Sequence, residues 1–359
     1  MKIYVFPADR DGCGQYRMIW PATVMKNAGY DIEIIEPHQR KTHLGAQLDM
    51  SGRVVDVITP PDADVIVIQR ITHDKMVSAI PLIRKRGIAV VMDIDDDLSA
   101  IHPDNAAFAV MHPADERFPD HNWHNAQRAC EASTAVIVST PGLLPVYGAK
   151  GNGHVLYNCV PERYLTVKHY DSDVIGWGGS MHSHPDDPAV MGNAIQRLMR
   201  DGHQFRVIGD GIGVQRALHL DVEPEVTGVV DLVTSWPEML SSLGVGVAPL
   251  SNTRFNRSKS WLKMLEMAAV GVPCVVSPRA EYLRLHYEGI GNIADKPQQW
   301  YTRLKRLATD ADYRLQVSQQ GREIAAQHTI EGNAWRWMEV WENAFKLERS
   351  NRPVFGFSK

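Results

Sequence analysis

The chain contains few cysteines, and none of them are closely spaced. The four present are Cys13, Cys130, Cys159 and Cys274, and they include no C-x-x-C pair. Zinc clusters need closely spaced ligands, and disulfide frameworks are typical of short, cysteine-dense secreted chains. The sequence therefore predicts neither a metal cluster nor a disulfide framework, and it favours a reducing, cytoplasmic location.

Long apolar runs and a strong excess of one charge are also absent. No stretch approaches the roughly 18 uninterrupted apolar residues that a membrane-spanning helix needs. The opening residues MKIYVFPADRDG pass from a short apolar strand into a polar turn, so we expect neither an integral membrane segment nor an export signal. The formal net charge of −4 gives no global nucleic-acid footprint, although a local basic patch is compatible with it.

Short apolar, β-branched runs alternate along the chain with segments of helical periodicity. In the first half the expected strands are residues 2–6, 31–35, 65–69, 89–93 and 135–139, with a helix at 16–27. In the second half they are 174–177, 205–208, 225–229, 245–248 and 273–277, with helices at 188–201, 236–243 and 259–270. Continuous apolar strands are typical of parallel sheets that helices cover on both faces. The sequence therefore predicts a doubly wound α/β fold.

The length and a pause in this alternation predict two domains. At roughly 100 to 200 residues per domain, the chain is long enough for two cores. The pause is a polar stretch that ends at Asp173, so we place one domain at residues 1–165 and the other at 172–329. A final helix, residues 330–349, is expected to cross back to the first domain. The aromatic residues on one face of this helix are Trp337, Trp341 and Phe345.

The turn after the first strand contains Gly12 and Gly14, and the next helix follows directly. Glycines let a ligand approach the backbone closely, and the free amides of a helix N-terminus favour anions. The third glycine of a dinucleotide fingerprint would fall at Arg17, so the turn is not that motif. It is either a ligand-binding loop or a plain tight turn.

Four aspartates follow the strand at residues 89–92, and they include Asp95 and Asp96. Carboxylates at the C-terminal end of a parallel strand lie where α/β proteins bind their ligands. Their mutual repulsion costs free energy, which is more readily tolerated at a site than elsewhere. Two other interpretations stay open: a helix N-cap with solvated acids, and a D-x-D pair that binds magnesium or manganese.

Two glycine-rich loops follow strands of the second half and are expected to face the ligand. Their candidate residues are Gly178, Gly179, Ser180 and Gly209. His182 and His184 form an H-x-H pattern nearby, but no third metal ligand stands at a readable spacing. We therefore favour a hydrogen-bonding or helix-capping role for these histidines.

The segment with the strongest functional signal is FNRSKSWLKMLEMAAVGVP, residues 255–273. Lys259 and Lys263 are one turn apart, so we expect them to share a helix face, with Glu266 three residues further on. Two ammonium groups could bind a diphosphate while the carboxylate accepts hydrogen bonds from ribose hydroxyls. The same pattern also fits a surface ladder of ion pairs.

Together these segments resemble the retaining GT-B glycosyltransferases of family four, and particularly their divergent bacterial and phage-encoded relatives. The resemblance covers most of the chain. Its main segment is FNRSKSWLKMLEMAAVGVPCVVSP, and the others are GCGQYRMIWPA, VVMDIDDDL, AVIVSTPGL, VLYNCVP, VIGDG and LSSLGVGVAPL. The resemblance implies two Rossmann-like domains facing across a cleft, the first on the acceptor side and the second binding a nucleotide-sugar.

The resemblance also implies roles for individual residues. Glu266 would bind the donor ribose, Lys263 and Lys259 the diphosphate, and Gly14 the sugar-phosphate region. Asp95 or Asp96 would line the reacting centre, near the position where many relatives have a histidine at the end of the same strand.

Two positions depart from the family pattern. The first Glu of the E-x7-E pair would fall at Ser258, and Gly244 stands where relatives often have Asp. The first departure affects sugar recognition and catalysis rather than the nucleotide site. Retaining enzymes of this fold are thought to react on the front face of the donor, with the leaving diphosphate as proton acceptor. Positioned cations then matter more than a protein nucleophile.

The expected activity is transfer of a hexose or pentose from a UDP- or GDP-sugar, with no additional cofactor and no metal site. The acceptor is open among a modified DNA base, a polysaccharide, a lipid and a protein. A DNA acceptor would need a basic rim, for which the candidates are Arg17, Arg70, Arg84 and Arg86. The alternative functions are a nucleotide-sugar epimerase or hydrolase on the same fold and a non-catalytic nucleotide-binding protein.

Overall fold

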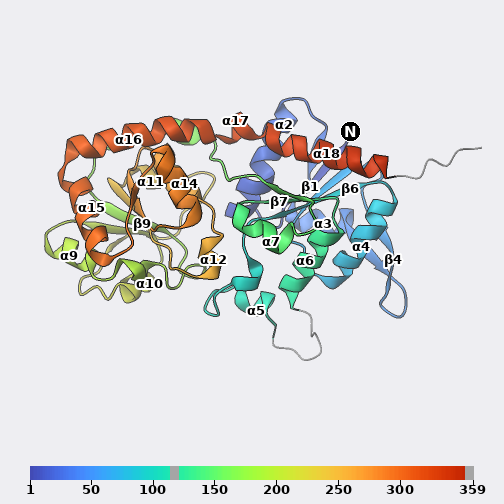
Figure 1. Cartoon of the computed structure of the whole chain (residues 1–359), viewed down its shortest axis with the longest axis horizontal. Helices are drawn as coiled ribbons and strands as arrows, with labels where there is room; N and C mark the ends of the chain where they lie inside the picture. The colour runs from blue at the N-terminus through green and yellow to red at the C-terminus, as the bar shows by residue number, and fades with distance from the viewer. Residues whose placement is uncertain (114–120, 352–359) are drawn as a thin grey trace, which may run out of the picture. The chain divides into compact units, whose positions relative to one another are not determined.

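The structure is a computed structural model that describes residues 1–113 and 121–351. The described chain forms two compact units (Figure 1). The first contains Met1–Ser99, Ala109–Tyr157 and the segment from Asn333 onward, and the second contains Ala100–Phe108 and Asn158–Gly332. Each unit has its own six-stranded parallel sheet, so the doubly wound α/β prediction is confirmed.

The sheet of the first unit has the strand order β2-β1-β5-β6-β7-β8. Every residue of β5 and β6 is buried, as expected for strands covered on both faces. The strand order reverses between β1 and β5, the position at which open α/β sheets bind ligands. The strands are β1 (Ile3–Phe6), β2 (Ile32–Ile34), β5 (Val65–Gln69), β6 (Ala89–Ile94), β7 (Ala135–Val138) and β8 (Gly153–Val155).

The helix predicted at residues 16–27 consists of two parts. A π-helical turn, η1 (Gln15–Ile19), precedes α2 (Trp20–Asn27). The π turn contains Arg17, whose side chain is completely buried. The other helical segments of this unit are α1 (Gly12–Gly14), η2 (Pro37–Gln39), α3 (Arg40–His43), α4 (Asp74–Lys85), η3 (Leu98–Ala100), α5 (Phe108–Met111), α6 (Asn122–Ala132), η4 (Pro141–Leu143) and α7 (Leu144–Tyr147).

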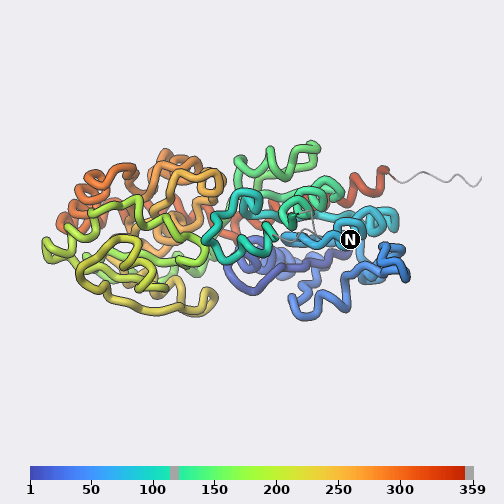
Figure 2. Tube along the Cα trace, turned by 90° about the horizontal axis from the view of Figure 1, so that it is seen from below, coloured from blue at the N-terminus to red at the C-terminus, as the bar shows by residue number. Residues whose placement is uncertain are grey.

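An antiparallel hairpin lies beside the first sheet. It consists of β3 (Gly45–Leu48) and β4 (Val54–Ile58), and both strands pack against α4. Figure 2 shows the hairpin in blue, at the side of this unit. The sequence analysis predicted neither of its strands.

The C-terminal helix α18 (Trp335–Ser350) belongs to the first unit, where it packs against β5, β6 and α2. Trp337 and Trp341 are buried on its inner face. Trp337 donates a hydrogen bond from Nε1 to the carbonyl of Arg17 at 3.1 Å, and Glu348 accepts one from Thr134 at 2.6 Å. The prediction that the last helix returns to the first domain is confirmed.

The sheet of the second unit has the strand order β11-β10-β9-β12-β13-β14, which is the dinucleotide-binding order 3-2-1-4-5-6. The order reverses between β9 and β12. Trp177 and Trp300 are fully buried in its core. The strands are β9 (Ile175–Gly179), β10 (Phe205–Gly209), β11 (Glu225–Val226), β12 (Val245–Ala248), β13 (Cys274–Val276) and β14 (Asn292–Ile293).

The helices of the second unit are shorter than predicted near the sheet reversal. The predicted helix at 188–201 is a 3₁₀ turn, η5 (Pro188–Met191), followed by α9 (Ala194–Arg200), and the one at 259–270 is α13 (Leu262–Ala269). The remaining segments are α8 (Arg163–Thr166), α10 (Gly211–Ala217), α11 (Trp236–Ser241), α12 (Arg254–Arg257), α14 (Ala280–Glu288), α15 (Pro297–Thr309), α16 (Ala311–Ala325), η6 (Ala326–His328) and α17 (Ile330–Asn333).

Residues 100–108 precede the second sheet by a long stretch of sequence but belong to its unit. The Asn105 amide donates to the carbonyl of Ser183 at 3.1 Å, and the backbone N–H of Ala106 donates to the carbonyl of His182 at 3.1 Å. These bonds attach the segment to the loop that follows β9. Within residues 1–113 and 121–351, no helix has the length and apolar character needed to cross a membrane.

Candidate functional site

The strand-order reversal of the second unit brings Lys263 to the end of β9. A Cβ atom placed on Gly179 would lie 2.5 Å from the Lys263 Nζ, so a larger residue here would displace the amine. The same amine lies 5.1 Å from the ring centroid of Trp177. Burial lowers the pKa of Lys263 to about 8; Lys259 contributes to the lowering, while Asp187 and Glu266 oppose it.

Lys259 does not share a helix face with Lys263, which corrects the sequence interpretation. Helix α13 begins at Leu262, and Lys259 lies in the loop before it. Long-range bonds hold this loop: Trp261 donates from Nε1 to the carbonyl of Asn158 at 2.7 Å, and Asn158 donates to the Ser260 hydroxyl at 3.0 Å. Periodicity alone could not show these contacts.

Glu266 lies on α13 and is only 4% exposed. Surface ion-pair ladders consist of solvated side chains, so a buried carboxylate does not fit that interpretation. A buried carboxylate needs polar or charged neighbours. Lys263 lies one turn earlier on the same helix, and the negative charge of Glu266 raises its pKa. The lysine and the acid therefore form part of an interior polar site.

The glycine loops clear space around these charged groups. Gly209 ends β10 with a φ of +136°, a conformation that favours glycine, and a Cβ there would collide with the carbonyl oxygen of Gly179. A Cβ on Gly178 would lie 2.8 Å from the ring of Trp236, so the packing of this ring also favours glycine at position 178. Ser180 is exposed at the start of the loop after β9.

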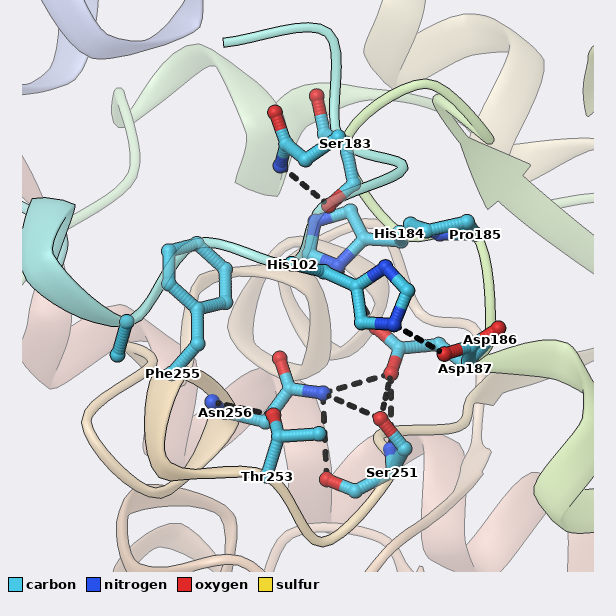
Figure 3. Close-up of a pocket in the computed structure, with 12 residues that line it drawn as sticks. His102, Ser183, His184, Pro185, Asp186, Asp187, Ser251, Thr253, Phe255 and Asn256 are labelled. Atoms are coloured by element: carbon cyan, nitrogen blue, oxygen red, sulfur yellow. Dashed lines mark hydrogen bonds and ion pairs between the residues drawn. The ribbon is translucent and has the colours of Figure 1, made fainter. Parts of the chain in front are cut away.

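A buried network around Asp187 joins the loops that follow β9 and β12 (Figure 3). One carboxylate oxygen accepts hydrogen bonds from the Ser251 backbone N–H and hydroxyl, both at 2.8 Å, and from the Asn256 amide at 2.6 Å. The other oxygen lies 2.7 Å from Nδ1 of His184. The sequence analysis missed Asp187, because Ser251 and Asn256 lie more than sixty residues away in the chain. The one local signal was the position of Asp187 three residues after its other partner, His184.

His184 is therefore a hydrogen-bonded residue, as favoured from the sequence. His182 is exposed and belongs to the same loop. The structure shows no group of three or more His, Cys, Asp or Glu residues able to hold a metal ion among residues 1–113 and 121–351.

Two carboxylates of the aspartate-rich loop in the first unit are held by neighbouring side chains. Arg17 forms a two-bond pair with Asp93, at 3.1 Å from Nε and 3.0 Å from Nη2, and both side chains are buried. Burial raises the pKa of Asp93 to about 6, and the guanidinium opposes this rise. Asp97 accepts hydrogen bonds from the Ser99 backbone N–H and hydroxyl, so it caps the turn that follows.

Asp95 and Asp96 lie at the end of β6, near Arg70. Asp95 is 7% exposed, and its Oδ1 lies 3.9 Å from Nε of Arg70. Arg70 also pairs with Asp9, and its backbone has a φ of 47°, an uncommon conformation for a residue with a side chain. Such strain is often found at functional sites.

The glycine turn of the first unit packs closely against Asp9. The Gly14 N–H donates to Asp9 Oδ1 at 2.9 Å, and a Cβ on Gly14 would collide with the Asp9 carbonyl oxygen. Gly12 begins the short helix α1, and Cys13 lies between the two glycines. Burial raises the pKa of the Cys13 thiol, and the charge of Asp95 adds to the rise.

The arginines considered for a nucleic-acid rim all form ion pairs with acids of this chain, and only the pair of Arg17 is buried. Arg17 is buried against Asp93 and offers no surface to an acceptor. The partners of the other three are Asp9 for Arg70, Glu348 for Arg84 and Asp56 for Arg86.

Residues 172–310 match the protein family described as glycosyl transferases group 1. This match covers the β9–β12 reversal, both lysines and Glu266. Comparison with curated protein sequences gives no significant match.

Solved structures share the fold over nearly the whole chain. The Anabaena protein HepE, in complex with UDP and glucose, is 12% identical with a TM-score of 0.64, over 95% of this chain and 99% of that one. A glycosyltransferase from Rickettsia africae is also 12% identical, with a TM-score of 0.64, over 96% and 99%. An alpha-glucosyltransferase in complex with UDP-glucose and DNA containing an abasic site is 11% identical, with a TM-score of 0.61, over 96% and 99%.

These likenesses identify the fold as GT-B, with two Rossmann-like units. The family match in the second unit defines the class of the protein: the chain is a glycosyltransferase.

Proposed function

We propose that the chain transfers a sugar from a UDP- or GDP-sugar to its acceptor with retention of anomeric configuration, and that the second unit binds the donor. The supporting observation is that the Lys263 amine lies against Gly179 at the β9 end of the reversal, with buried Glu266 three residues further along the same helix. In α/β sheets of this strand order, nucleotides bind at the reversal.

In this proposal the two lysines bind the donor diphosphate and Glu266 binds the ribose. Burial and mutual repulsion make the free site unfavourable for two ammonium groups, and a diphosphate would remove that repulsion. As the glycosidic bond breaks, negative charge grows on the leaving diphosphate. Cations already fixed in place stabilise that charge without reorganising.

Gly14, Asp95 and Asp96 are proposed to serve the sugar and the acceptor. Gly14 permits close backbone approach, and the two carboxylates can accept hydrogen bonds from hydroxyl groups. With Ser258 in place of the first Glu of the family pair, sugar recognition has to use other groups. We assign no protein nucleophile: the leaving diphosphate is the proposed acceptor of the incoming proton.

UDP-glucose is the first donor to test, because two of the similar structures contain UDP with glucose or UDP-glucose. A base in DNA is the first acceptor to test, because one of these neighbours is a complex with DNA. Arg17 is buried in its pair with Asp93, so contacts to DNA phosphates would use other cations.

The test is nucleotide binding followed by turnover. Thermal unfolding is measured with UDP, GDP, ADP and UDP-glucose, and a ligand at about 100 times its Kd stabilises the folded state by about 2.7 kcal/mol. Absence of a shift with every nucleotide would contradict the proposal. Release of free sugar without an acceptor would instead favour a hydrolase, and binding without any turnover would favour a non-catalytic nucleotide-binding protein.

A further inference from the structure

His184 is held in one orientation beside the proposed diphosphate site. Its Nδ1 lies 2.7 Å from the carboxylate of Asp187, and the side chains of the two residues are 10% and 4% exposed. A carboxylate only accepts hydrogen bonds, so Nδ1 carries the hydrogen of the neutral ring. The lone pair of the neutral ring is therefore on Nε2.

Asp187 accepts four hydrogen bonds from its neighbours. One of its oxygens accepts three hydrogen bonds from Ser251 and Asn256, and the other faces His184. The network therefore fixes the imidazole, and a hydrogen-bonded carboxylate is well suited to stabilise the ring when it becomes charged. In the described part of the chain, Nε2 of His184 has no hydrogen-bond partner.

His184 also lines a small pocket. The pocket has a free volume of about 40 Å³, and Phe255, Asn256 and Ser251 line it together with His184 and Asp187 (Figure 3). A space of this size holds a few waters or one small polar group. It is suited to a phosphate oxygen or a sugar hydroxyl rather than to a nucleotide base.

The charged groups around His184 come from several elements. Lys263 is on α13, Lys259 is in the loop before it, and Asp187 lies at the start of η5. On the facing segment, Nε2 of His102 lies 3.0 Å from the Asp186 carboxylate. Burial, followed by the charge of Lys263, lowers the pKa of His184 to about 4, while Asp187 raises it. A bound anion would reverse the effect of the lysines.

We propose that His184 is neutral in the free enzyme and becomes an imidazolium when a nucleotide-sugar diphosphate binds beside it, so that donor binding takes up a proton. The inference rests on the proposed donor site. The proton comes from solvent and goes to Nε2, which then donates a charged hydrogen bond to a phosphate oxygen. No covalent bond changes in this step. His184 thereby supplies a third cation that is present only while the anion is bound.

The experiment is isothermal titration of the full chain with UDP-glucose in buffers of different ionisation enthalpy. UDP-glucose is a diphosphate diester without a group that titrates near neutrality, so any proton uptake belongs to the protein. At about pH 6, Lys263 is already protonated, because its pKa is about 8. We expect uptake approaching one proton per bound UDP-glucose, and a Kd that falls by up to about tenfold for each pH unit between about pH 7.5 and 5.5.

Two variants locate the proton. His184→Gln keeps a donor for Asp187 but cannot be charged, so we expect no uptake, about tenfold weaker binding at about pH 6, and a flat pH dependence. His182→Gln, in the exposed neighbour on the same loop, should behave like wild type. Thermal unfolding of both variants checks that they are folded.

The outcomes separate this inference from the proposed function. Binding of UDP-glucose by wild type without proton uptake overturns the role of His184 and leaves the donor site standing. Uptake that persists in folded His184→Gln also overturns it, since the proton then goes elsewhere. Failure to bind UDP, GDP, ADP and UDP-glucose alike removes the proposed function itself.

Discussion

In each unit the strand order reverses beside the first strand of the sheet, but the charged residues near the two reversals differ. At the reversal of the first unit, arginines meet aspartates: Arg17 pairs with Asp93, and Arg70 with Asp9. At the reversal of the second unit, Lys259 lies close enough to Lys263 for its positive charge to lower the pKa of Lys263. The first site pairs its arginines with acids of its own chain, whereas the second holds two amines that repel each other. This contrast supports the proposal that the second unit binds the anionic donor.

The largest effect is expected from breaking the internal pairing of the first unit. Arg17→Met leaves Asp93 buried without its guanidinium, and loss of one partner of a buried pair costs about 3 to 5 kcal/mol. We expect this loss in the free energy of unfolding, measured by urea denaturation. UDP affinity of the folded fraction should be unchanged, because both residues lie in the first unit and the proposed nucleotide site lies in the second.

The double variant Arg17→Met with Asp93→Leu is the matched control. It removes both charges, so most of the lost stability should return. If it is as unstable as the single variant, the pair is not the cause of the loss, and the contrast between the two reversals weakens.

The second largest effect is expected from removing the amine at the end of β9. Lys263→Ala should reduce kcat/KM for the donor by about 100- to 1000-fold, the usual cost of removing one group that stabilises developing charge. Initial rates of nucleotide release measure it. Lys168→Ala, in an exposed lysine of the same unit, serves as control, and equal rates for Lys263→Ala and wild type would refute the central role of Lys263.

The pH dependence of the wild-type enzyme sharpens the comparison further. Because the pKa of Lys263 is lowered to about 8, the ammonium loses its proton as the pH rises through that value. Donor kcat/KM, which reports the free enzyme, should fall above about pH 8 by up to tenfold per unit. Lys263→Arg should lack this fall whatever its absolute rate, since a guanidinium stays charged. The same decline in Lys263→Arg would assign it to another group.

The smallest effect is expected at Lys259. It lies in the loop before α13, where its Nζ is 4.9 Å from the ring of Phe255. Lys259→Ala should raise the donor KM by about tenfold, the loss of one charged hydrogen bond, and leave kcat within about twofold. It should also raise the pKa seen in the kcat/KM profile, because the repulsion on Lys263 is removed. An unshifted profile would show that the two amines do not interact.

The sequence predicted the fold through its apolar strands. The runs at 65–69 and 89–93 are continuous and buried along their whole length, which is why they could be found without a structure. The hairpin β3–β4 escaped notice because its strands are largely exposed and lack such a run. Helix starts were less predictable, since contacts of Trp261 and Asn158 from distant parts of the chain set the beginning of α13.

The candidate site was only partly predictable for the same reason. Lys263 and Glu266 are close in sequence, and their spacing on one helix points to a shared site. Asp187, Ser251 and Asn256 come from separate loops, and only the sheet brings them together. Arg17 was considered a surface cation because arginines are mostly exposed, yet the π turn places it inside.

The membership of residues 100–108 in the second unit has a consequence for engineering. The chain passes from one unit to the other after residues 99, 108, 157 and 332, so neither unit is a contiguous piece of the gene. A chimera that exchanges only residues 158–332 would separate the loop after β9 from the Asn105 and Ala106 hydrogen bonds that support it. A working graft of the donor half would have to transplant the nine-residue insertion from the other half along with it.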